Sequence, residues 1–388
     1  MSDIVILSAA RTAIGTFGGS LAAVPPITLG ATVASAAIER AGIAPDRVGT
    51  VVFGHVINTE PRDMYLSRVA AMEAGVPETV PAMNVNRLCG SGAQAIVSAV
   101  QSLMLGDADV ALAGGAESMS RAPFIVPQQR WGAKMGDVAS LDMMLGALNC
   151  PFGTGHMGVT AENVADEHGV SREDQDAFAL DSQTRAARAI AEGRFKDQIV
   201  PVEMQTRKGS ISFATDEHPR ETTAEALAGL RAAFRKDGSV TAGNASGIND
   251  GAAALILARA DADAGTPLAR VLGYAVSGVR PEVMGIGPVP AVRKLLERTG
   301  LSIGDFAVIE SNEAFAAQAV AVSRELGIDP DRVNPNGGAI ALGHPVGATG
   351  AILTVKALYE LKRIGGGRAI VTMCIGGGQG IALAIESV

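Results

Sequence analysis

The 388-residue sequence is poor in aromatic side chains and in cysteine. Aromatic residues make up 4% of it, with a single tryptophan, although 47% of the residues are hydrophobic. The interior must therefore be built from Ala, Val, Ile, Leu and Gly, which suits helices packed closely on a sheet. Three cysteines cannot form a set of disulfides, and their spacing matches no zinc-binding motif. We therefore expect a reducing, cytoplasmic setting and no metal site.

An excess of basic residues is missing as well, because the formal net charge is −8. This balance argues against a nucleic-acid partner. No window reaches the roughly 18 consecutive apolar residues of a membrane-spanning helix, and no basic stretch precedes an apolar run at the start. The chain also lacks a Gly-x4-Gly-Lys-Ser/Thr phosphate loop and a His-Glu-x-x-His zinc motif. We therefore predict neither a membrane partner nor a nucleotide or zinc hydrolase.

What the sequence does contain is an internal repeat. Residues 38–43 (IERAGI) resemble residues 296–301 (LERTGL), at an offset of 258 positions. The same offset relates residues 91–93 (SGA) to residues 349–351 (TGA), and each of these triplets precedes a helical pattern. Apolar strand patterns follow both copies of both motifs. The sequence therefore predicts an α/β fold made of two similar halves.

The two copies differ by one long insertion. In the second copy, residues 376–380 turn directly into the last strand, whereas in the first copy about 120 residues intervene. The insertion contains an amphipathic helix at 172–192, opened by a capping box at Ser171. We predict three parts, which are an N-terminal core half (1–117 plus 240–265), an inserted loop domain (118–239) and a C-terminal core half (266–388). A site would lie where loops of the two halves converge, with the insertion covering it.

Cys89 is the strongest candidate for chemistry. It stands in a glycine-rich turn, NRLCGSG at residues 86–92, directly before a helical pattern at 94–104. A thiol at the positive end of a helix is favoured as thiolate, which is the nucleophilic form. Cys150, in contrast, has the features of an inert buried cysteine.

A histidine and a second cysteine near the end of the chain complete a possible acyl-transfer site. His344 lies in an irregular run rich in Gly and Pro (334–345), and the internal offset places it at the position of Asn86. Cys374 ends a strand pattern and precedes three glycines. The repeat thus predicts that both loops lie at equivalent ends of the two halves, where a nucleophilic thiol and an imidazole can meet. His55, His168 and His218 have no comparable context.

Two further groups have alternative interpretations. Asn312 directly follows a strand pattern and is either a helix N-cap or an amide that positions a water or a carbonyl. Met157, next to His156, is either core filler or part of an adaptable loop, and the neighbouring glycines favour the loop.

These motifs resemble those of the thiolase family over the whole chain. They are NRLCGSG (86–92), GGAESMS (114–120), NASGINDG (244–251), NEAFA (312–316), NPNGG (334–338), GHP (343–345) and CIGGGQG (374–380). Residues 59–65 and 130–136 are similar to those of biosynthetic bacterial β-ketothiolases that supply polyhydroxyalkanoate synthesis. The resemblance implies a duplicated core layered α-β-α-β-α, with an inserted loop domain that binds coenzyme A.

The resemblance also implies a role for each catalytic residue. Cys89 attacks an acyl-CoA thioester and becomes acylated, and His344 takes its proton. Cys374 removes the α-proton of a second acetyl-CoA. Asn312 orients a water that forms one oxyanion site with His344, and the amides of Cys89 and Gly376 form the other. The implied substrate-binding residues are Leu148, His156, Met157, Arg220, Ala242, Ser246, Met284, Ala314 and Phe315.

The predicted activity is a reversible Claisen condensation of acetyl-CoA with a short acyl-CoA, giving acetoacetyl-CoA or 3-ketovaleryl-CoA. Acetyl-CoA, 3-ketoacyl-CoA and CoA are substrates, so we expect no cofactor, and the family implies a homotetramer or homodimer. The alternative is a degradative thiolase for longer 3-ketoacyl-CoA. A decarboxylating condensing enzyme of the ketoacyl synthase type has His or Asn where Cys374 stands, and a non-catalytic acyl-CoA-binding protein would have lost site residues that are present here.

Overall fold

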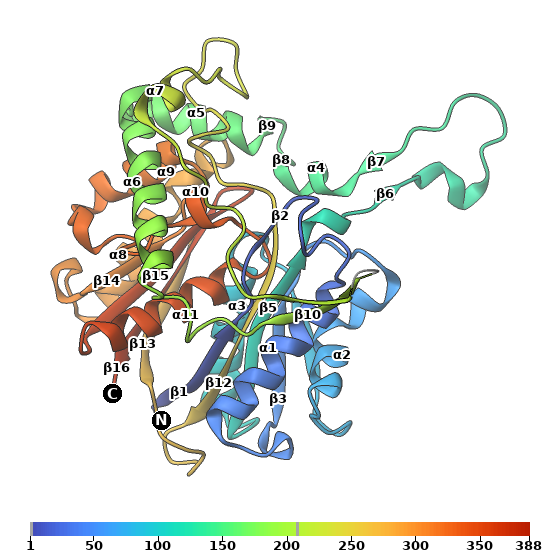
Figure 1. Ribbon diagram of the computed structural model, residues 1–388, viewed down its shortest axis with the longest axis vertical. Coiled ribbons are helices and arrows are strands. Elements are labelled where there is room, and N and C mark those ends of the chain that lie inside the picture. The colour runs from blue at the N-terminus through green and yellow to red at the C-terminus, as the bar shows by residue number, and fades with distance from the viewer. Residues whose placement is uncertain (1–2, 207–208) are drawn as a thin grey trace.

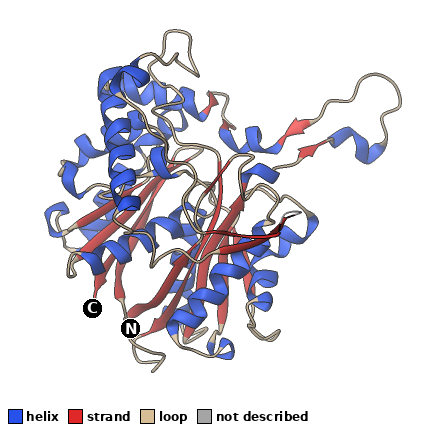
Figure 2. Cartoon of the chain, viewed as in Figure 1, coloured by secondary structure: helices blue, strands red, loops and turns tan. Residues whose placement is uncertain are grey.

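A computed structural model describes residues 3–206 and 209–388 of the chain, and in this part of it ten strands gather into one large sheet flanked by helices (Figures 1 and 2). The strand order is β14-β15-β16-β13-β1-β12-β5-β3-β4, with β2 paired to β12. The strands are β1 (Ile4–Arg11), β2 (Gly15–Thr16), β3 (Thr50–Gly54), β4 (Ala82–Val85), β5 (Val110–Ser118), β6 (Phe124–Ile125), β7 (Leu141–Asp142), β8 (Asn149–Cys150), β9 (Gly155–His156), β10 (Val202–Thr206), β11 (Gly209–Phe213), β12 (Asn249–Arg259), β13 (Ala269–Gly278), β14 (Val308–Ser311), β15 (Arg368–Ile375) and β16 (Gln379–Ser387). Strands β6 and β7, β8 and β9, and β10 and β11 form three separate two-stranded sheets.

The sheet is built from two equivalent halves, as the repeat predicts. The order β3-β5-β12-β1 in the first half matches β14-β15-β16-β13 in the second. In both halves the first pair of this series is parallel and the second pair is antiparallel. Only two residue pairs, Val5 with Arg270 and Ile6 with Ala269, join β1 to β13. The two halves are therefore separate sheet segments that meet along a short seam.

Helices cover both halves and fill the space between them. The α-helices are α1 (Pro26–Ala41), α2 (Leu66–Glu73), α3 (Ser91–Leu105), α4 (Met143–Leu148), α5 (Met157–His168), α6 (Arg172–Ala191), α7 (Ala224–Ala228), α8 (Pro288–Thr299), α9 (Ala316–Leu326), α10 (Ala339–Leu342) and α11 (Thr349–Arg363). Helix α1 packs on β1, β5 and β12, whereas α8 packs on β13 and β16. Helices α3 and α11 contact each other and strands of both halves. The predicted duplicated, layered α/β fold is confirmed.

Glycines allow α3 and α11 to cross at their first turns. A Cβ added to Gly92 would lie 2.7 Å from the backbone nitrogen of Ala351. A Cβ added to Gly350 would lie 2.2 Å from the backbone nitrogen of Ala93. Real Cβ atoms do not approach backbone this closely, so both positions require glycine. The two contacts are equivalent under the 258-residue offset, which shows that the sequence repeat is a pseudo-twofold contact in space.

The chain between β5 and β12 forms a separate layer over one end of the sheet. Ser171 caps α6, with the reciprocal capping box predicted from the sequence. A buried ion pair ties this segment to the core, because Arg11 contacts Asp216 at 2.7 Å and stacks over Phe195. Figure 1 shows the loop between β6 and β7 extending away from the body. The predicted boundaries 1–117 plus 240–265, 118–239 and 266–388 remain a prediction.

One apolar segment stands out in the described part of the chain. By length and composition alone, residues 88–105 could cross a membrane, although Ser91, Gln94 and Gln101 interrupt the apolar run. This segment is essentially α3, which contacts α11 and the strands β3, β5 and β16. Its apolar character follows from its position between the two halves, where small and aliphatic side chains are buried on several sides.

Substituting Gly350 tests the helix crossing. The Gly350→Ala variant should lose at least the roughly 1–3 kcal/mol of unfolding free energy that overpacked cores lose, because the clash is with backbone rather than a flexible side chain. Gly146→Ala is the matched control, since Gly146 lies in helix α4 and a Cβ there would meet nothing within 4 Å. Urea unfolding measures both. Equal stability of the two variants would contradict the crossing.

Candidate active site

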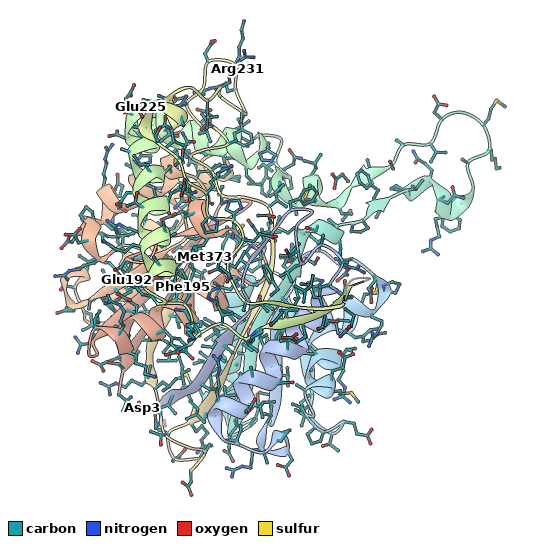
Figure 3. The ribbon with its side chains drawn as sticks, viewed as in Figure 1. Asp3, Glu192, Phe195, Glu225, Arg231 and Met373 are labelled. Atoms are coloured by element: carbon teal, nitrogen blue, oxygen red, sulfur yellow. The ribbon has the colours of Figure 1, made fainter. Side chains whose placement is uncertain are left out.

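A cavity of about 230 Å³ opens where loops of both halves meet the inserted segment. It is lined by Val56, Leu88, Cys89, Met119, Ala147, Leu148, His156, Met157, Phe234, Ala245, Ser246, Gly247, Ile248, Met284, Ala314, Phe315, His344, Val346, Cys374 and Gly376. Four of the five predicted catalytic residues and seven of the nine predicted substrate-binding residues are in this set. Figure 3 shows Met373, the neighbour of Cys374, in the interior of the molecule.

Cys89 lies in a strained turn between β4 and α3. Leu88 has φ +45°, which is uncommon for a residue with a side chain. The Ser91 hydroxyl stabilises this turn by accepting from the Arg87 amide at 2.9 Å and donating to the Leu88 carbonyl at 2.6 Å. Gly90 occupies the N-cap position, and the helix begins at Ser91 rather than at the cysteine. The turn therefore presents the sulfur to the cavity just ahead of the helix.

The expectation of a ready-made thiolate at Cys89 is wrong. Burial raises the pKa of the Cys89 thiol, although the backbone amides of Gly376 and of Cys89 itself act in the opposite direction. The residue keeps some exposure through the cavity, but the sulfur is desolvated. Desolvation penalises the charged form, so the resting thiol is neutral and needs a base to become a nucleophile.

His344 lines the same cavity as Cys89 and is the candidate for that base. Its backbone amide donates to Asn249 Oδ1 at 2.9 Å, and its Nδ1 lies 2.6 Å from Thr349 Oγ1. The Thr349 hydroxyl has one proton, which it donates to the Pro345 carbonyl at 2.9 Å. Nδ1 must therefore carry the imidazole proton, so Nε2 is unprotonated and its lone pair can accept a proton. Burial lowers the pKa of His344 to about 4, so the ring is neutral at physiological pH.

The side chain of Asn312 contacts His344 at its Nε2 atom. Its Nδ2 lies 3.4 Å from His344 Nε2, and its Oδ1 is buried with no hydrogen-bond partner in the described part of the chain. The N-cap interpretation is wrong, because Phe315 occupies the N-cap position of α9. The main chain at Asn312 is fixed on both sides, because its backbone N–H donates to the Thr372 carbonyl and its backbone carbonyl accepts from Gln318 Nε2. The unsatisfied oxygen supports the alternative interpretation, in which the amide orients a small polar group.

Cys374 faces Cys89 from the other half. It is the penultimate residue of β15, and it is 1% exposed. Burial raises the pKa of its thiol well above the usual range, and the neighbouring Cys89 adds to this rise. The charge coupling requires that the two sulfurs lie near each other. Both thiols are therefore protonated at rest, in a site whose imidazole is neutral.

Aromatic rings form one wall of the cavity. The His156 ring stacks on Phe234 with centroids 4.7 Å apart, and Phe234 meets Phe315 edge-on at 6.0 Å. Met157 is 6% exposed and begins helix α5, so the adaptable-loop interpretation is wrong. Phe234 could not be predicted from the sequence, because it lies within the inserted segment in no recognisable motif. Asn249 and Thr349 were not among the predicted site residues, although both lie within or beside motifs given above.

Two predicted substrate-binding residues lie outside this cavity. Arg220 donates from Nη2 to the carbonyl of Ala242 at 3.0 Å, and neither residue lines the cavity wall. Arg220 instead lines a separate surface hollow between α6 and α7, at the outer side of the inserted segment. Within residues 3–206 and 209–388, no group of three His, Cys, Asp or Glu side chains is arranged to hold a metal ion.

Two thiols, an imidazole and an amide that converge between duplicated halves define a thiolase-type acyl-transfer site. Residues 4–261 match the thiolase N-terminal domain, and residues 265–387 match the thiolase C-terminal domain. The chain belongs to the thiolase family. It is 60% identical to beta-ketothiolase BktB of Cupriavidus necator, with 100% of this chain and 99% of that protein covered.

Solved structures show the same relationship. The acetyl-CoA acetyltransferase of Bacillus anthracis superposes with a TM-score of 0.98 at 47% identity, covering 100% of this chain and 99% of that one. Human mitochondrial 3-ketoacyl-CoA thiolase in complex with CoA superposes with a TM-score of 0.96 at 44% identity, covering 100% and 98%. These likenesses extend over the two halves and the inserted segment alike.

The lowered pKa of His344 gives a testable pH dependence. A base with a pKa near 4 stays neutral above that pH, so the acylation rate of Cys89 should change less than about twofold between pH 7 and pH 5. An imidazole with the ordinary pKa of about 6.5 would give a fall of roughly twentyfold over the same range. Stopped-flow acylation measures this rate, and a fall of the larger size would contradict the assignment of His344 as a desolvated neutral base.

Proposed function

We propose that this protein is a short-chain β-ketothiolase that condenses acetyl-CoA with a short acyl-CoA through an acyl-Cys89 intermediate. The observation that carries the proposal is the convergence of Cys89, Cys374 and His344 on one cavity, with all three groups uncharged at rest. A neutral imidazole beside a neutral thiol suits general-base activation. No resident cofactor is required, because coenzyme A thioesters enter as substrates.

The first half-reaction transfers the acyl group to the enzyme. His344 Nε2 takes the Cys89 proton as the sulfur attacks the thioester carbonyl, and CoA leaves as a thiolate. That thiolate takes the proton of Cys374, so CoA departs as a thiol and Cys374 becomes the thiolate. The imidazolium at His344 remains in the site. The bond that forms and the bond that breaks are both thioester bonds of similar energy, so the step is reversible.

The second half-reaction forms the new carbon–carbon bond. The Cys374 thiolate removes the α-proton of a second acetyl-CoA, and the enolate attacks the acyl carbon on Cys89. The Cys89 sulfur leaves as a thiolate and recovers its proton from His344. All three groups return to their resting states, and the products are a 3-ketoacyl-CoA and CoA. Running these steps backwards is thiolysis.

Negative charge develops on two oxygens during this cycle, and the site offers donors for both. The backbone amides of Gly376 and Cys89 face the Cys89 sulfur and can stabilise the acyl oxygen. The imidazolium of His344, together with a water held by the unpartnered Oδ1 of Asn312, can stabilise the enolate oxygen. Donors fixed before the reaction are worth more than water, because they need no reorganisation.

The inserted segment supports recognition of CoA. Ser246 lines the cavity, and Arg220 lies at the outer side of the segment, where a phosphate could approach it. A coenzyme A thioester is long and carries its phosphates far from its acyl group. The guanidinium of Arg220 suits the phosphate end, and the Ser246 hydroxyl suits the part of the molecule that enters the cavity. We assign the phosphates to Arg220, the pantetheine to Ser246, and Ala242 to the segment between them. The human relative was solved in complex with CoA, which supports CoA as the ligand.

The proposal also includes the oligomeric state of the protein and a role in supplying precursors for polyhydroxyalkanoate synthesis. The loop between β6 and β7 projects from the body and exposes Trp131 by 87% and Met135 by 98%, which favours burial in a homodimer or homotetramer (Figure 1). Sedimentation velocity would give the oligomeric state. The polyhydroxyalkanoate role and the cytoplasmic setting stay predictions from the sequence.

Intact-protein mass spectrometry tests the intermediate. Incubation with acetyl-CoA should add one acetyl group to the wild type and none to Cys89→Ala. The Cys374→Ser variant should still be acetylated, because the imidazolium of His344 can protonate the departing CoA in place of Cys374, but it should lose acetoacetyl-CoA synthesis at least a hundredfold, because the α-proton step needs the Cys374 thiolate. Acetylation of Cys89→Ala at the wild-type level would contradict the assignment of the nucleophile.

Truncating Phe234 tests the chain-length preference. Its ring closes one wall between His156 and Phe315, so Phe234→Ala should raise the ratio of kcat/KM for ten-carbon to four-carbon 3-ketoacyl-CoA by about tenfold. Leu145→Ala, at an exposed position outside the cavity, is a control and should leave the ratio unchanged. A uniform loss of kcat/KM at all chain lengths would show that the ring contacts a part common to all substrates.

A wild-type enzyme that is more active on sixteen-carbon than on four-carbon 3-ketoacyl-CoA would instead favour the degradative alternative.

A further inference from the structure

A buried carboxylate outside the cavity connects the two halves beside the site. Glu117 is the penultimate residue of β5, and its side chain is fully buried. Its Oε2 accepts hydrogen bonds from the Val56 amide at 3.0 Å and from the Gly347 amide at 2.9 Å. Its Oε1 accepts from the Ile57 amide at 3.1 Å. Val56 and Ile57 belong to the N-terminal half, and Gly347 belongs to the C-terminal half.

The backbone groups that Glu117 holds adjoin the reacting residues. Val56 lines the cavity, and its carbonyl accepts from Asn86 Nδ2 at 3.4 Å, within the Cys89 turn. Gly347 follows His344 by three residues, and the intervening Val346 also lines the cavity. A Cβ added to Gly347 would lie 2.4 Å from Glu117 Oε2, so the loop reaches the carboxylate only because residue 347 is glycine.

The charge of Glu117 does not help the nucleophile. Its negative charge raises the pKa of Cys89, which disfavours the thiolate. Burial raises the pKa of Glu117 itself, while His55 and the three amides lower it. His55 Nδ1 lies 3.4 Å from Oε1 and 2.9 Å from the Ala116 carbonyl, and Asp63 faces the other ring nitrogen at 4.0 Å. Three main-chain amides donate to Glu117, and the His55 Nδ1 proton goes to the Ala116 carbonyl, so the arrangement suits a carboxylate whose benefit is geometric.

We propose that Glu117 is a positioning residue that fixes the His344 loop of one half against the Cys89 wall of the other. This inference rests on the proposed function. A carboxylate with both oxygens occupied by main-chain donors from two halves acts as a cross-link, because each amide that loses its acceptor is left buried and unsatisfied. Where the helix crossing sets the distance between the halves, this cross-link fixes the loop that carries the imidazole against the wall beside the thiol.

The Glu117→Gln variant separates geometry from charge. Its amide nitrogen cannot accept, so at least one main-chain donor loses its partner, and kcat with acetoacetyl-CoA and CoA should fall at least tenfold with KM within twofold. Removal of the charge should at the same time lower the pKa of Cys89. The pH profile of Cys89 alkylation by iodoacetamide, followed by peptide mass spectrometry, measures that pKa. A loss of kcat with an easier thiol ionisation is a result that simple loss of stability does not produce.

The Gly347→Ala variant keeps the charge and breaks the contact from the other side. Its kcat should also fall at least tenfold, while the pKa of Cys89 stays at the wild-type value and alkylation at pH 7 slows because His344 has moved.

Glu162→Gln is the matched control. Glu162 is an equally buried carboxylate that accepts the main-chain amides of Ser239 and Val240, but these amides belong to one short stretch of chain and neither lies in the C-terminal half. Its kcat should stay within twofold of the wild type.

Thermal denaturation and circular dichroism check that each variant is folded. If Glu117→Gln does not fold, Gly347→Ala decides the question. Wild-type kcat in either folded variant, or a loss no larger than that of Glu162→Gln, overturns the proposal. If the wild type does not turn over acetoacetyl-CoA, the proposed function fails on its own. The positioning role is then decided by alkylation of Gly347→Ala at pH 7, and a wild-type rate there overturns it.

Discussion

The close crossing of α3 and α11 is the constraint on which the site depends. Each helix begins directly after a loop that carries a reacting group, so the separation of their first turns sets the separation of Cys89 and His344. Gly92 and Gly350 let the two backbones touch where any side chain would force them apart. The sheet contributes little to this distance, because β1 and β13 are joined by only two residue pairs. The helix contact, rather than strand pairing, holds the two halves at their working distance.

Desolvation determines the electrostatics of the site. Burial keeps both thiols protonated and His344 unprotonated, so the resting cavity contains no net charge of its own. In the proposed mechanism, charge develops when a proton moves from the Cys89 sulfur to the His344 imidazole, beside the backbone amides of Cys89 and Gly376 and the Asn312 side chain. A low-dielectric cavity strengthens those interactions. The same desolvation that makes the thiols poor acids thus makes their ion pair with the imidazolium effective.

Much of this arrangement could be predicted from the sequence, because short local motifs encode it and because related motifs occur in both halves. The offset of 258 residues predicted that Cys89 and His344 lie at equivalent ends of two halves, and the structure brings both to one cavity. The protonation of Cys89 was mispredicted, because a nearby helix is visible in the sequence whereas burial by a second half is not. Asn312 was ambiguous because a polar residue after a strand suits either a cap or a site. Phe234 and Glu117 act through partners that only the tertiary fold brings near.

The position of the insertion also affects the order in which the chain can fold. Strands β15 and β16 are joined by three residues, so their pairing costs little loop entropy. The equivalent strands β5 and β12 pair across about 130 residues, as between Ser118 and Asp250. Contacts that close long loops form late. Strands β15 and β16 can therefore pair without any other segment, whereas the pairing of β5 with β12 requires that the whole inserted segment has been synthesised.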